Sequence, residues 1–284
     1  MPDYPYTLCD VFAERPLAGN PLAVFTDGDA VPDPLRQPIA RELNLSETVF
    51  VCSPAHGGDA RLRIFTPRRE LPFAGHPTLG AGAIIARLRQ RTRLQLETIA
   101  GAIPVTIDGD LNSEREARFA WMRQPLPQRS TYDRPDALLA ALGLDAALRP
   151  PAVYDNGIAH IYVAVDGPQR LAALTPDFSA LASLCPDVGV ACFARDGARW
   201  KVRMFAPGHG VHEDAATGSA AGPLAALLVE IGEITAGTQI ELEQGTEIGR
   251  PSSLLVRTEG SERSITRIDV GGMAIPVGKG VLSL

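Results

Sequence analysis

Two apolar helices, one in each half of the chain, constrain its fold more than any other feature. The first is predicted over 77–89 and carries small or apolar side chains on nearly every face until Arg87. The second is predicted over 219–231 and is equally apolar. A helix without a polar face is enclosed by other structure and does not lie on a surface. We therefore expect each helix to run through the middle of its own domain.

The two helices occupy equivalent places in a repeat. Sliding the chain on itself lays Gly75-His76, at the head of the first helix, over Gly218-Ser219, at the head of the second. The offset is 219 − 76 = 143 residues, about half of the 284-residue chain, and the order of predicted elements is the same in both halves. Because sequence identity between the halves is slight, we infer a repeat of architecture and not of sequence.

Strands and turn-rich segments surround both helices. The patterns predict strands over 6–12, 22–25, 47–52, 60–66, 94–97, 103–107, 158–165, 190–193 and 200–205, and short helices over 34–43 and 177–184. A chain of this length exceeds the size at which a single hydrophobic core usually stops growing. We expect an α+β protein of two domains, 1–117 and 118–264, with a C-terminal strand over 265–284 completing the first.

Charge and composition exclude several classes of function. The net charge of −6 and the scattered basic residues argue against a nucleic-acid partner. No window of 18 apolar residues and no signal-peptide pattern occurs, so we expect no membrane association and a cytoplasmic location. The four cysteines form no C-x-x-C pair and are expected to be buried and reduced. With no nucleotide or metal motif in the sequence, we expect no cofactor and no metal.

The two helix heads are candidate anion receptors. The first turn of a helix presents N–H groups without intrahelical partners, and glycine lets a ligand approach them closely. A carboxylate or a developing enolate could be held there. Simple capping by Ser219 and a tight turn at Gly75 explain the same residues equally well.

Three other polar residues have ordinary explanations when spacing alone is considered. Glu47 opens a predicted strand, where a glutamate usually faces solvent. His76, between Gly75 and Pro77, is more often a locally hydrogen-bonded histidine than a catalyst. A structural role explains Asp214 equally well, since its carboxylate could cap the turn that follows it.

Five ordered segments favour a functional interpretation of these residues. They are ERPLAGNPLAVF (14–25), NLSETVFV (44–51), FTPRRELPFAGHPTLGAG (65–82), HEDAATGSAAGPLAALL (212–228) and QGTEIGRPS (244–252). Together they resemble the PhzF-like family of phenazine-biosynthesis isomerases over essentially the full chain. The combination is specific, because unrelated folds have no reason to share five signatures in the same order.

The resemblance implies the fold of diaminopimelate epimerase: two similar domains related by a pseudo-twofold axis, each a curled, mostly antiparallel sheet around a central helix, with the active site in the cleft between them. It assigns catalytic roles by position, with Glu47 as the proton-shuttling acid/base, and substrate-binding roles to three further residues. The implied catalytic residues are Glu47, His76, Asp214 and Ser219, and the implied substrate-binding residues are Gly75, Gly218 and Asn20.

One position departs from the family pattern. Relatives commonly carry Asp-Pro-Ala-Thr-Gly-Ser in the fourth segment, whereas this chain has Ala215 after Asp214. Loss of the proline frees one backbone φ angle. The polar residues keep their spacing, so we expect their roles to be unchanged and the identity of the substrate to be the open question.

The implied activity is a cofactor-independent isomerisation in which Glu47 moves a proton between carbons of a small conjugated amino or hydroxy carboxylic acid, as in trans-2,3-dihydro-3-hydroxyanthranilate isomerases. Two alternatives stay open: an amino-acid racemase or epimerase of the same fold, which normally needs two bases on opposite faces, and a non-catalytic protein that binds a small ligand. The expected partners are a small acidic metabolite and, by resemblance, a second copy in a homodimer.

Overall fold

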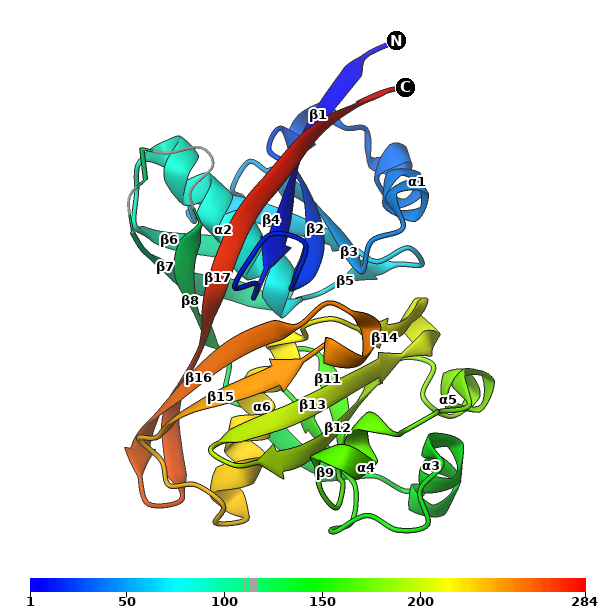
Figure 1. The fold of residues 1–284 in the computed structure, drawn as a ribbon. Helices are drawn as coiled ribbons and strands as arrows, with labels where there is room; N and C mark the ends of the chain where they lie inside the picture. The colour runs from blue at the N-terminus through cyan, green and yellow to red at the C-terminus, as the bar shows by residue number, and fades with distance from the viewer. Residues whose placement is uncertain (110, 113–116) are drawn as a thin grey trace. The chain divides into compact units, whose positions relative to one another are not determined.

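The computed structural model describes residues 1–109, 111–112 and 117–284. The chain divides into two compact units, one formed by Met1–Arg123 with Asp269–Leu284 and the other by Gln124–Ile268. Both combine a curled sheet with a long buried helix (Figure 1). The expected α+β class and the curled sheet around a helix are confirmed.

The first unit is built on a mostly antiparallel sheet. Its strands are β1 (Asp3–Val11), β2 (Asn20–Phe25), β3 (Glu47–Cys52), β4 (Ala60–Phe65), β5 (Glu70–Leu71), β6 (Arg93–Thr98), β7 (Gly101–Asp108) and β8 (Arg118–Gln124), joined by the end of β17 (Ser264–Ser283). The β2–β3 and β4–β6 pairs are parallel, and β1–β2, β1–β17, β3–β4, β4–β5, β6–β7 and β7–β8 are antiparallel. β1 and β17 run side by side over most of their common length (Figure 1).

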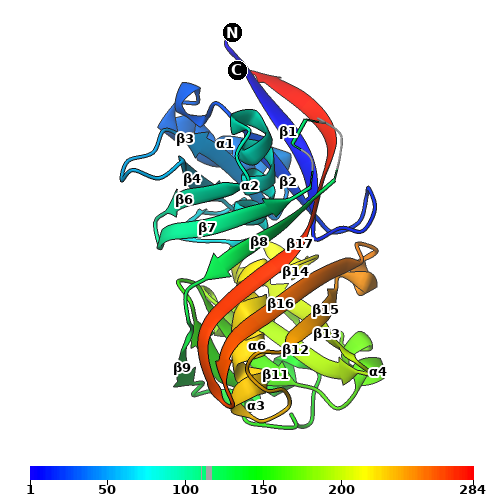
Figure 2. The same cartoon turned by 90° about the vertical axis from the view of Figure 1, so that its left-hand side faces the viewer.

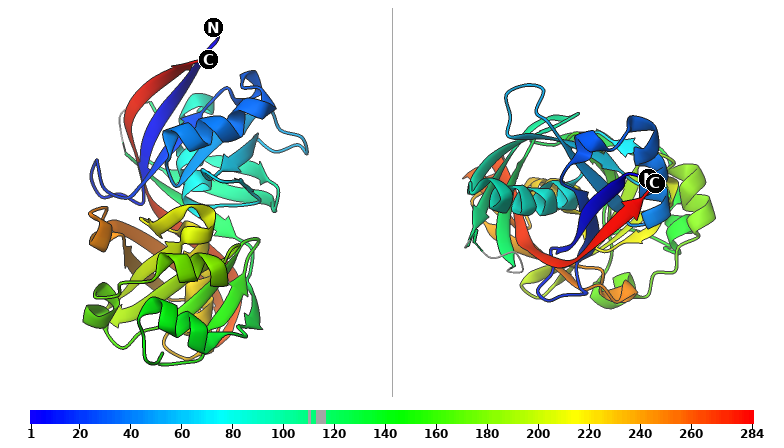
Figure 3. Two further views of the ribbon diagram at one scale, coloured as in Figure 1. Left: turned by 90° about the vertical axis from the view of Figure 1, so that its right-hand side faces the viewer. Right: turned by 90° about the horizontal axis from the view of Figure 1, so that it is seen from above.

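Two helices pack on this sheet. α2 (Gly75–Arg89) is buried without interruption from Gly75 to Ala86, which confirms that the first apolar helix is enclosed. Gly80 lets it approach the sheet, because a Cβ there would lie 2.6 Å from Val11. α1 (Asp33–Leu43) is amphipathic and packs on an aromatic cluster that includes Phe50. Figure 3 shows this helix on the outside of the strands of the first unit.

The second unit repeats the plan. Its strands are β9 (Gln128–Thr131), β10 (Ala152–Asp155), β11 (Ala159–Ala164), β12 (Gly189–Asp196), β13 (Arg199–Ala206), β14 (Val211–Asp214), β15 (Gln239–Gln244) and β16 (Ser252–Ser261), and its helices are α3 (Pro135–Leu142), α4 (Pro168–Ala172), α5 (Phe178–Leu184) and α6 (Gly218–Glu230). Side chains of α3, α4 and α5 share a hydrophobic core with β11 and β12. α6 is the long buried helix of this unit (Figure 2).

The repeat extends to the way in which strands pair. In the first unit β2 and β3 are parallel, β3 and β4 antiparallel, and β4 and β6 parallel across α2. In the second unit β11 and β12, β12 and β13, and β13 and β15 pair in the same three ways, the last across α6. The internal repeat inferred from the order of elements is therefore also a repeat of strand pairing.

Both central helices begin earlier than the sequence indicated. α2 begins at Gly75 and not at Pro77, and α6 begins at Gly218 and not at Ser219. Pro77 is tolerated as the third residue because the first four N–H groups of a helix have no partner within it. The glycine, and the histidine or serine after it, consequently lie inside the first turn of each helix.

Candidate active site

Three of the expected site residues meet in the first unit. Glu47 is the first residue of β3, His76 is the second residue of α2, and Asn20 is the first residue of β2. The His76 Nε2 atom lies 3.3 Å from Glu47 Oε2, and its Nδ1 atom lies 3.1 Å from the Asn20 amide nitrogen. The imidazole therefore lies between an amide and a carboxylate.

The Asn20 contact fixes the proton on the His76 ring. Because an amide NH₂ group can only donate, Nδ1 must accept, and the single proton of the neutral ring is assigned to Nε2, beside Glu47. His76 is only 2% exposed, and this burial lowers its pKa from 6.5 to about 3. At neutral pH the ring is thus uncharged, and its Nε2 atom lies 3.3 Å from the carboxylate without the geometry of a hydrogen bond.

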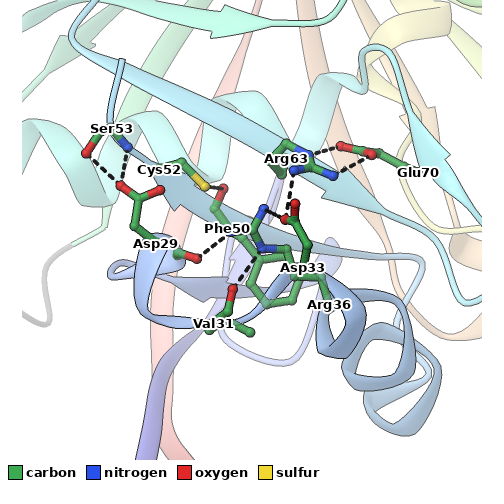
Figure 4. Close-up of polar contacts among 10 residues, drawn as sticks. Asp29, Val31, Asp33, Arg36, Phe50, Cys52, Ser53, Arg63 and Glu70 are labelled. Carbon is green, nitrogen blue, oxygen red and sulfur yellow. Dashed lines mark hydrogen bonds and ion pairs between the residues drawn. The ribbon is translucent and has the colours of Figure 1, made fainter. Parts of the chain in front are cut away.

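Strand pairing and a chain of charged groups hold this arrangement. Glu47 pairs with Leu22 in the parallel β2–β3 ladder, which fixes it relative to Asn20 two residues earlier on β2. On β4, Arg63 makes a two-pronged ion pair with Glu70 of β5 and also contacts Asp33 of α1 (Figure 4). This clasp fixes β5 immediately before the loop that enters α2 at Gly75.

A buried guanidinium supports the same region from inside. Arg36 of α1 donates to the carbonyl oxygens of Gly28 and Val31 and lies over the Phe50 ring (Figure 4). It therefore holds the segment before α1 against β3, the strand that begins with Glu47. Local spacing in the sequence does not indicate these roles for Arg36 and Arg63, because their partners are neighbours only in the folded chain.

The second unit holds Asp214 and Ser219 on either side of one turn. Asp214 ends β14, and its Oδ2 atom accepts a hydrogen bond of 2.6 Å from the Thr217 hydroxyl. The buried Gln244 side chain accepts from the Thr217 N–H and donates to the Asp214 carbonyl oxygen. Gln244 begins the QGTEIGRPS segment, so the structure gives this signature a role in shaping the turn before α6.

Ser219 is the second residue of α6 and is 3% exposed. Its Oγ atom lies 3.1 Å from Nε2 of His160, a residue of β11. Burial, with a smaller contribution from His209, lowers the pKa of His160 from 6.5 to about 3. His160 was not expected from the sequence, since one histidine in an otherwise apolar strand gives no pattern that points to a residue 59 positions away.

The chemistry available at these residues is proton transfer and anion binding. Glu47 is the ionisable group beside the neutral His76, and Gly75 and Gly218 each open a buried helix. Across the described residues, no group of three potential ligands is arranged to hold a metal ion.

All four cysteines are buried, as expected, and burial raises the pKa of each thiol. The thiols are therefore protonated at neutral pH and do not act as bases.

Comparison with known proteins identifies relatives along the whole chain. The model of the family described as phenazine biosynthesis-like protein matches residues 9–280. A trans-2,3-dihydro-3-hydroxyanthranilate isomerase from Pseudomonas fluorescens is 45% identical over 98% of this chain and 99% of its own length. The protein of the same name from Pseudomonas aeruginosa is 46% identical over 94% of this chain and 95% of its own.

Solved structures agree on the fold. A phenazine biosynthesis protein of the PhzF family from Bacillus anthracis superposes with a TM-score of 0.85 at 25% identity, covering 100% of both chains. A probable proline racemase from Agrobacterium radiobacter superposes with a TM-score of 0.72 at 13% identity, covering 99% of this chain and 93% of its own. The racemase comparison concerns the fold alone.

Within the described residues, none of the helices has the length and apolar character needed to cross a bilayer.

Proposed function

Because the chain belongs to the phenazine biosynthesis-like protein family and is an isomerase, we propose that it moves a proton between two carbons of a small conjugated amino or hydroxy carboxylic acid, without a cofactor. Glu47 is the acid/base in this proposal. The observation that carries it is the 3.3 Å contact between Glu47 and a buried, neutral His76 at the start of α2.

The proton transfer needs only one carboxyl group. Glu47 as a carboxylate takes a proton from the carbon activated by conjugation, so one C–H bond breaks and the electron pair enters the conjugated system. The same carboxyl group, now protonated, returns the proton to a second carbon on the same face, where a new C–H bond forms. Atoms and electrons balance within the substrate, as an isomerisation requires.

His76 acts as a neutral group beside Glu47 in this scheme. Its ring lies 3.3 Å from the Glu47 carboxylate, and its low pKa prevents it from becoming a competing base. Asn20 holds the ring in the correct tautomer through Nδ1. We therefore propose Asn20 as a residue that orients His76, in addition to the substrate-binding role expected from resemblance.

The start of α6 is proposed to bind the substrate carboxylate. The thirteen-residue helix begins with Gly218, and its N–H groups and partial positive charge suit an anion. The Ser219 hydroxyl adds a donor, and Asp214, held by Thr217, can accept from an amino or hydroxyl group of the substrate. Gly75 at the start of α2 is proposed to give the substrate close access to the backbone.

The isomerases from Pseudomonas suggest the substrate class. Their name specifies trans-2,3-dihydro-3-hydroxyanthranilate, a cyclic amino and hydroxy carboxylic acid. We propose that this chain acts on that compound or on a close analogue with the same conjugated carboxylic acid. Identity of 45% over nearly the full length supports this choice.

The racemase alternative would need a second base, which neither helix head supplies. Its mechanism places bases on opposite faces of one carbon, yet the two helix heads carry His76, which is neutral, and Ser219. The strand of the second unit that corresponds to β3 begins with Gly189, where β3 begins with Glu47. A single acid/base is therefore favoured by the difference between the two repeats. The non-catalytic alternative is wrong, because full-length relatives at 45% identity are isomerases.

Proton exchange tests the proposal. The protein is incubated with trans-2,3-dihydro-3-hydroxyanthranilate in heavy water, and product formation and deuterium uptake are followed by NMR. We expect Glu47→Gln to lower turnover by at least about 100-fold, the usual contribution of a general acid/base. Glu42→Gln, which alters an exposed glutamate of α1, is the matched control and should react like the parent protein. Equal exchange by Glu47→Gln and the parent protein would show that another group moves the proton.

A further inference from the structure

Side chains from outside α6 donate hydrogen bonds to the backbone carbonyl groups of its first turn. Gln124, the last residue of β8 and the first residue of the second unit, donates to the Gly218 carbonyl oxygen at 2.7 Å. The amide of Asn156, which follows β10, donates to the Ser219 carbonyl oxygen at 3.0 Å. Tyr162 of β11 donates from its hydroxyl to the next carbonyl oxygen, that of Ala220, at 2.8 Å. Three successive carbonyl groups of α6 thus have a side-chain donor.

The sequence of α6 makes these side-chain donors necessary. The Ser219 carbonyl would normally accept from the backbone N–H four residues later, but Pro223 stands there and has no N–H. The Asn156 amide takes its place. Gly222 leaves room for these donors, because a Cβ at this position would collide with the Gln124 amide oxygen. The first turn is therefore fixed in direction by contacts that a free helix end would lack.

His160 is the fourth side chain of this set, and it reaches the Ser219 side chain. Its Nε2 atom lies 3.1 Å from Ser219 Oγ, and both residues are more than nine-tenths buried. Its other ring nitrogen, Nδ1, has no hydrogen-bond partner among the residues that the structure describes. That nitrogen faces Gly189, where an added Cβ would lie 3.1 Å away, and the sulfur of Met204 lies beside the same point.

This environment decides which nitrogen carries the proton. A buried N–H group without an acceptor is rare in proteins, whereas a lone pair can rest against a Cα–H group at little cost. The lone pair therefore belongs on Nδ1, against Gly189, and the proton on Nε2. Nε2 must then donate to Ser219 Oγ, which frees the hydroxyl proton of Ser219 for another acceptor.

We infer that His160 is a positioning residue that donates from Nε2 to Ser219 Oγ and thereby directs the Ser219 hydroxyl proton towards a carboxylate oxygen of the substrate. The inference rests on the proposed role of Ser219 in binding that carboxylate. It also gives Ser219 a defined chemical character: the hydroxyl is a hydrogen-bond donor and not a nucleophile, because no base takes its proton.

Kinetics of two His160 variants test the role. His160→Leu removes the donor, and His160→Gln offers an amide N–H that can replace it. For the trans-2,3-dihydro-3-hydroxyanthranilate reaction we expect His160→Leu to raise KM about tenfold or more with a smaller effect on kcat, the loss expected for a hydrogen bond to a charged group. His160→Gln should recover most of the loss. Tyr132→Phe, which removes a hydroxyl of the same unit that lies beside Cys185 Sγ and away from α6, is the matched control and should leave KM unchanged.

Two kinetic outcomes would contradict the inference. If KM of His160→Leu equals that of the parent protein, or if Tyr132→Phe raises KM as much as His160→Leu does, His160 only stabilises the unit and the inference is overturned. Thermal unfolding of all three variants, measured alongside, separates a loss of folded protein from a loss of substrate binding.

A second measurement needs no substrate. Nitrogen NMR of the ¹⁵N-labelled histidine rings in the unaltered protein should show His160 with a protonated Nε2 and an unprotonated Nδ1 between pH 5 and 8, with His160→Gln identifying the signal. A proton on Nδ1 would overturn the inference. If the tautomer is as expected but the protein converts no conjugated acid, the proposed function fails and the assignment of His160 as a donor to Ser219 stands.

Discussion

At the scale of single residues, each unit holds a histidine that its own burial keeps uncharged. His76 lies beside Glu47, and His160 lies beside Ser219. Burial lowers the pKa of both rings to about 3. Each ring can then donate one proton in a fixed direction without taking up another. Their common property is that both rings stay uncharged at neutral pH.

The same burial predicts a loss of stability in acid. The unfolded chain protonates a histidine near pH 6.5, and the folded chain only near pH 3, so between these values the unfolded state binds more protons. The contribution of the uncharged His160 to the unfolding free energy is complete above pH 6.5 and is lost as pH falls towards 3. We expect His160→Gln to reduce the slope of unfolding free energy against pH by up to about 1.4 kcal/mol per pH unit, the value for one proton.

Urea unfolding at several pH values between 4 and 8 measures this slope. The control is His212→Gln, which alters an exposed histidine stacked on Phe178. Parallel curves for His160→Gln and the parent protein would mean that His160 is protonated equally in the folded and unfolded states.

The sequence predicted some of these residues and missed others for a physical reason. Glu47, His76 and Asn20 came from the resemblance, since contacts among residues 20, 47 and 76 depend on strand pairing that local spacing does not encode. His160 and Asn156 lie in no signature segment, and their partners are on a helix some 60 residues away. Their roles become visible only when β10, β11 and α6 are packed together. The catalytic roles of Glu47, His76, Asp214 and Ser219 stay predictions that the proposed variants test.

At the scale of elements, hydrophobic periodicity predicted the two central helices and most strands of the first unit, but it missed β8, β15 and the ten-residue β16. The strand Glu47–Cys52 begins and ends as expected, and α1 begins one residue earlier than expected. Short or polar elements such as α3 and β9 were not predicted, because four to eight residues carry too little pattern. The sequence pattern also gave no sign of the role of Pro223 inside α6, which leaves the Ser219 carbonyl oxygen to the Asn156 amide.

The Pro223 position gives a prediction about α6. Asn156→Ala leaves the Ser219 carbonyl buried without a donor and should lower the unfolding free energy by about 1–3 kcal/mol. In a Pro223→Ala background the backbone N–H of residue 223 returns, so the same change should cost about 1 kcal/mol less. Urea unfolding of the four proteins of this double-mutant cycle measures the difference.

Additive effects in this cycle would contradict the assignment, because they would mean that Asn156 does not replace the missing N–H of Pro223. The second bond of Asn156, to the Gln124 side chain, is present in both backgrounds and so cancels in the comparison.

At the scale of the whole molecule, the first unit is assembled from both ends of the chain. β1 pairs with β17 from Asp3–Ser283 to Val11–Ala274. Removing residues 276–284 takes away the partner of β1 from Asp3 to Cys9. We expect faster amide hydrogen exchange in β1 and β2, while peptides from residues 124–268 keep their protection, as measured by mass spectrometry. Removing only Ser283 and Leu284 is the control and should change exchange little. Unchanged exchange in β1 after the longer deletion would refute this dependence.

The pairing of the first and last strands also orders events during synthesis. Residues 124–268 form one continuous unit, and all of them leave the ribosome before the residues that complete the first unit. The second unit can therefore fold while β1 still has an unpaired edge. The first unit is completed only by residues 269–284, and a nascent protein that stops short of them presents an open strand to its neighbours.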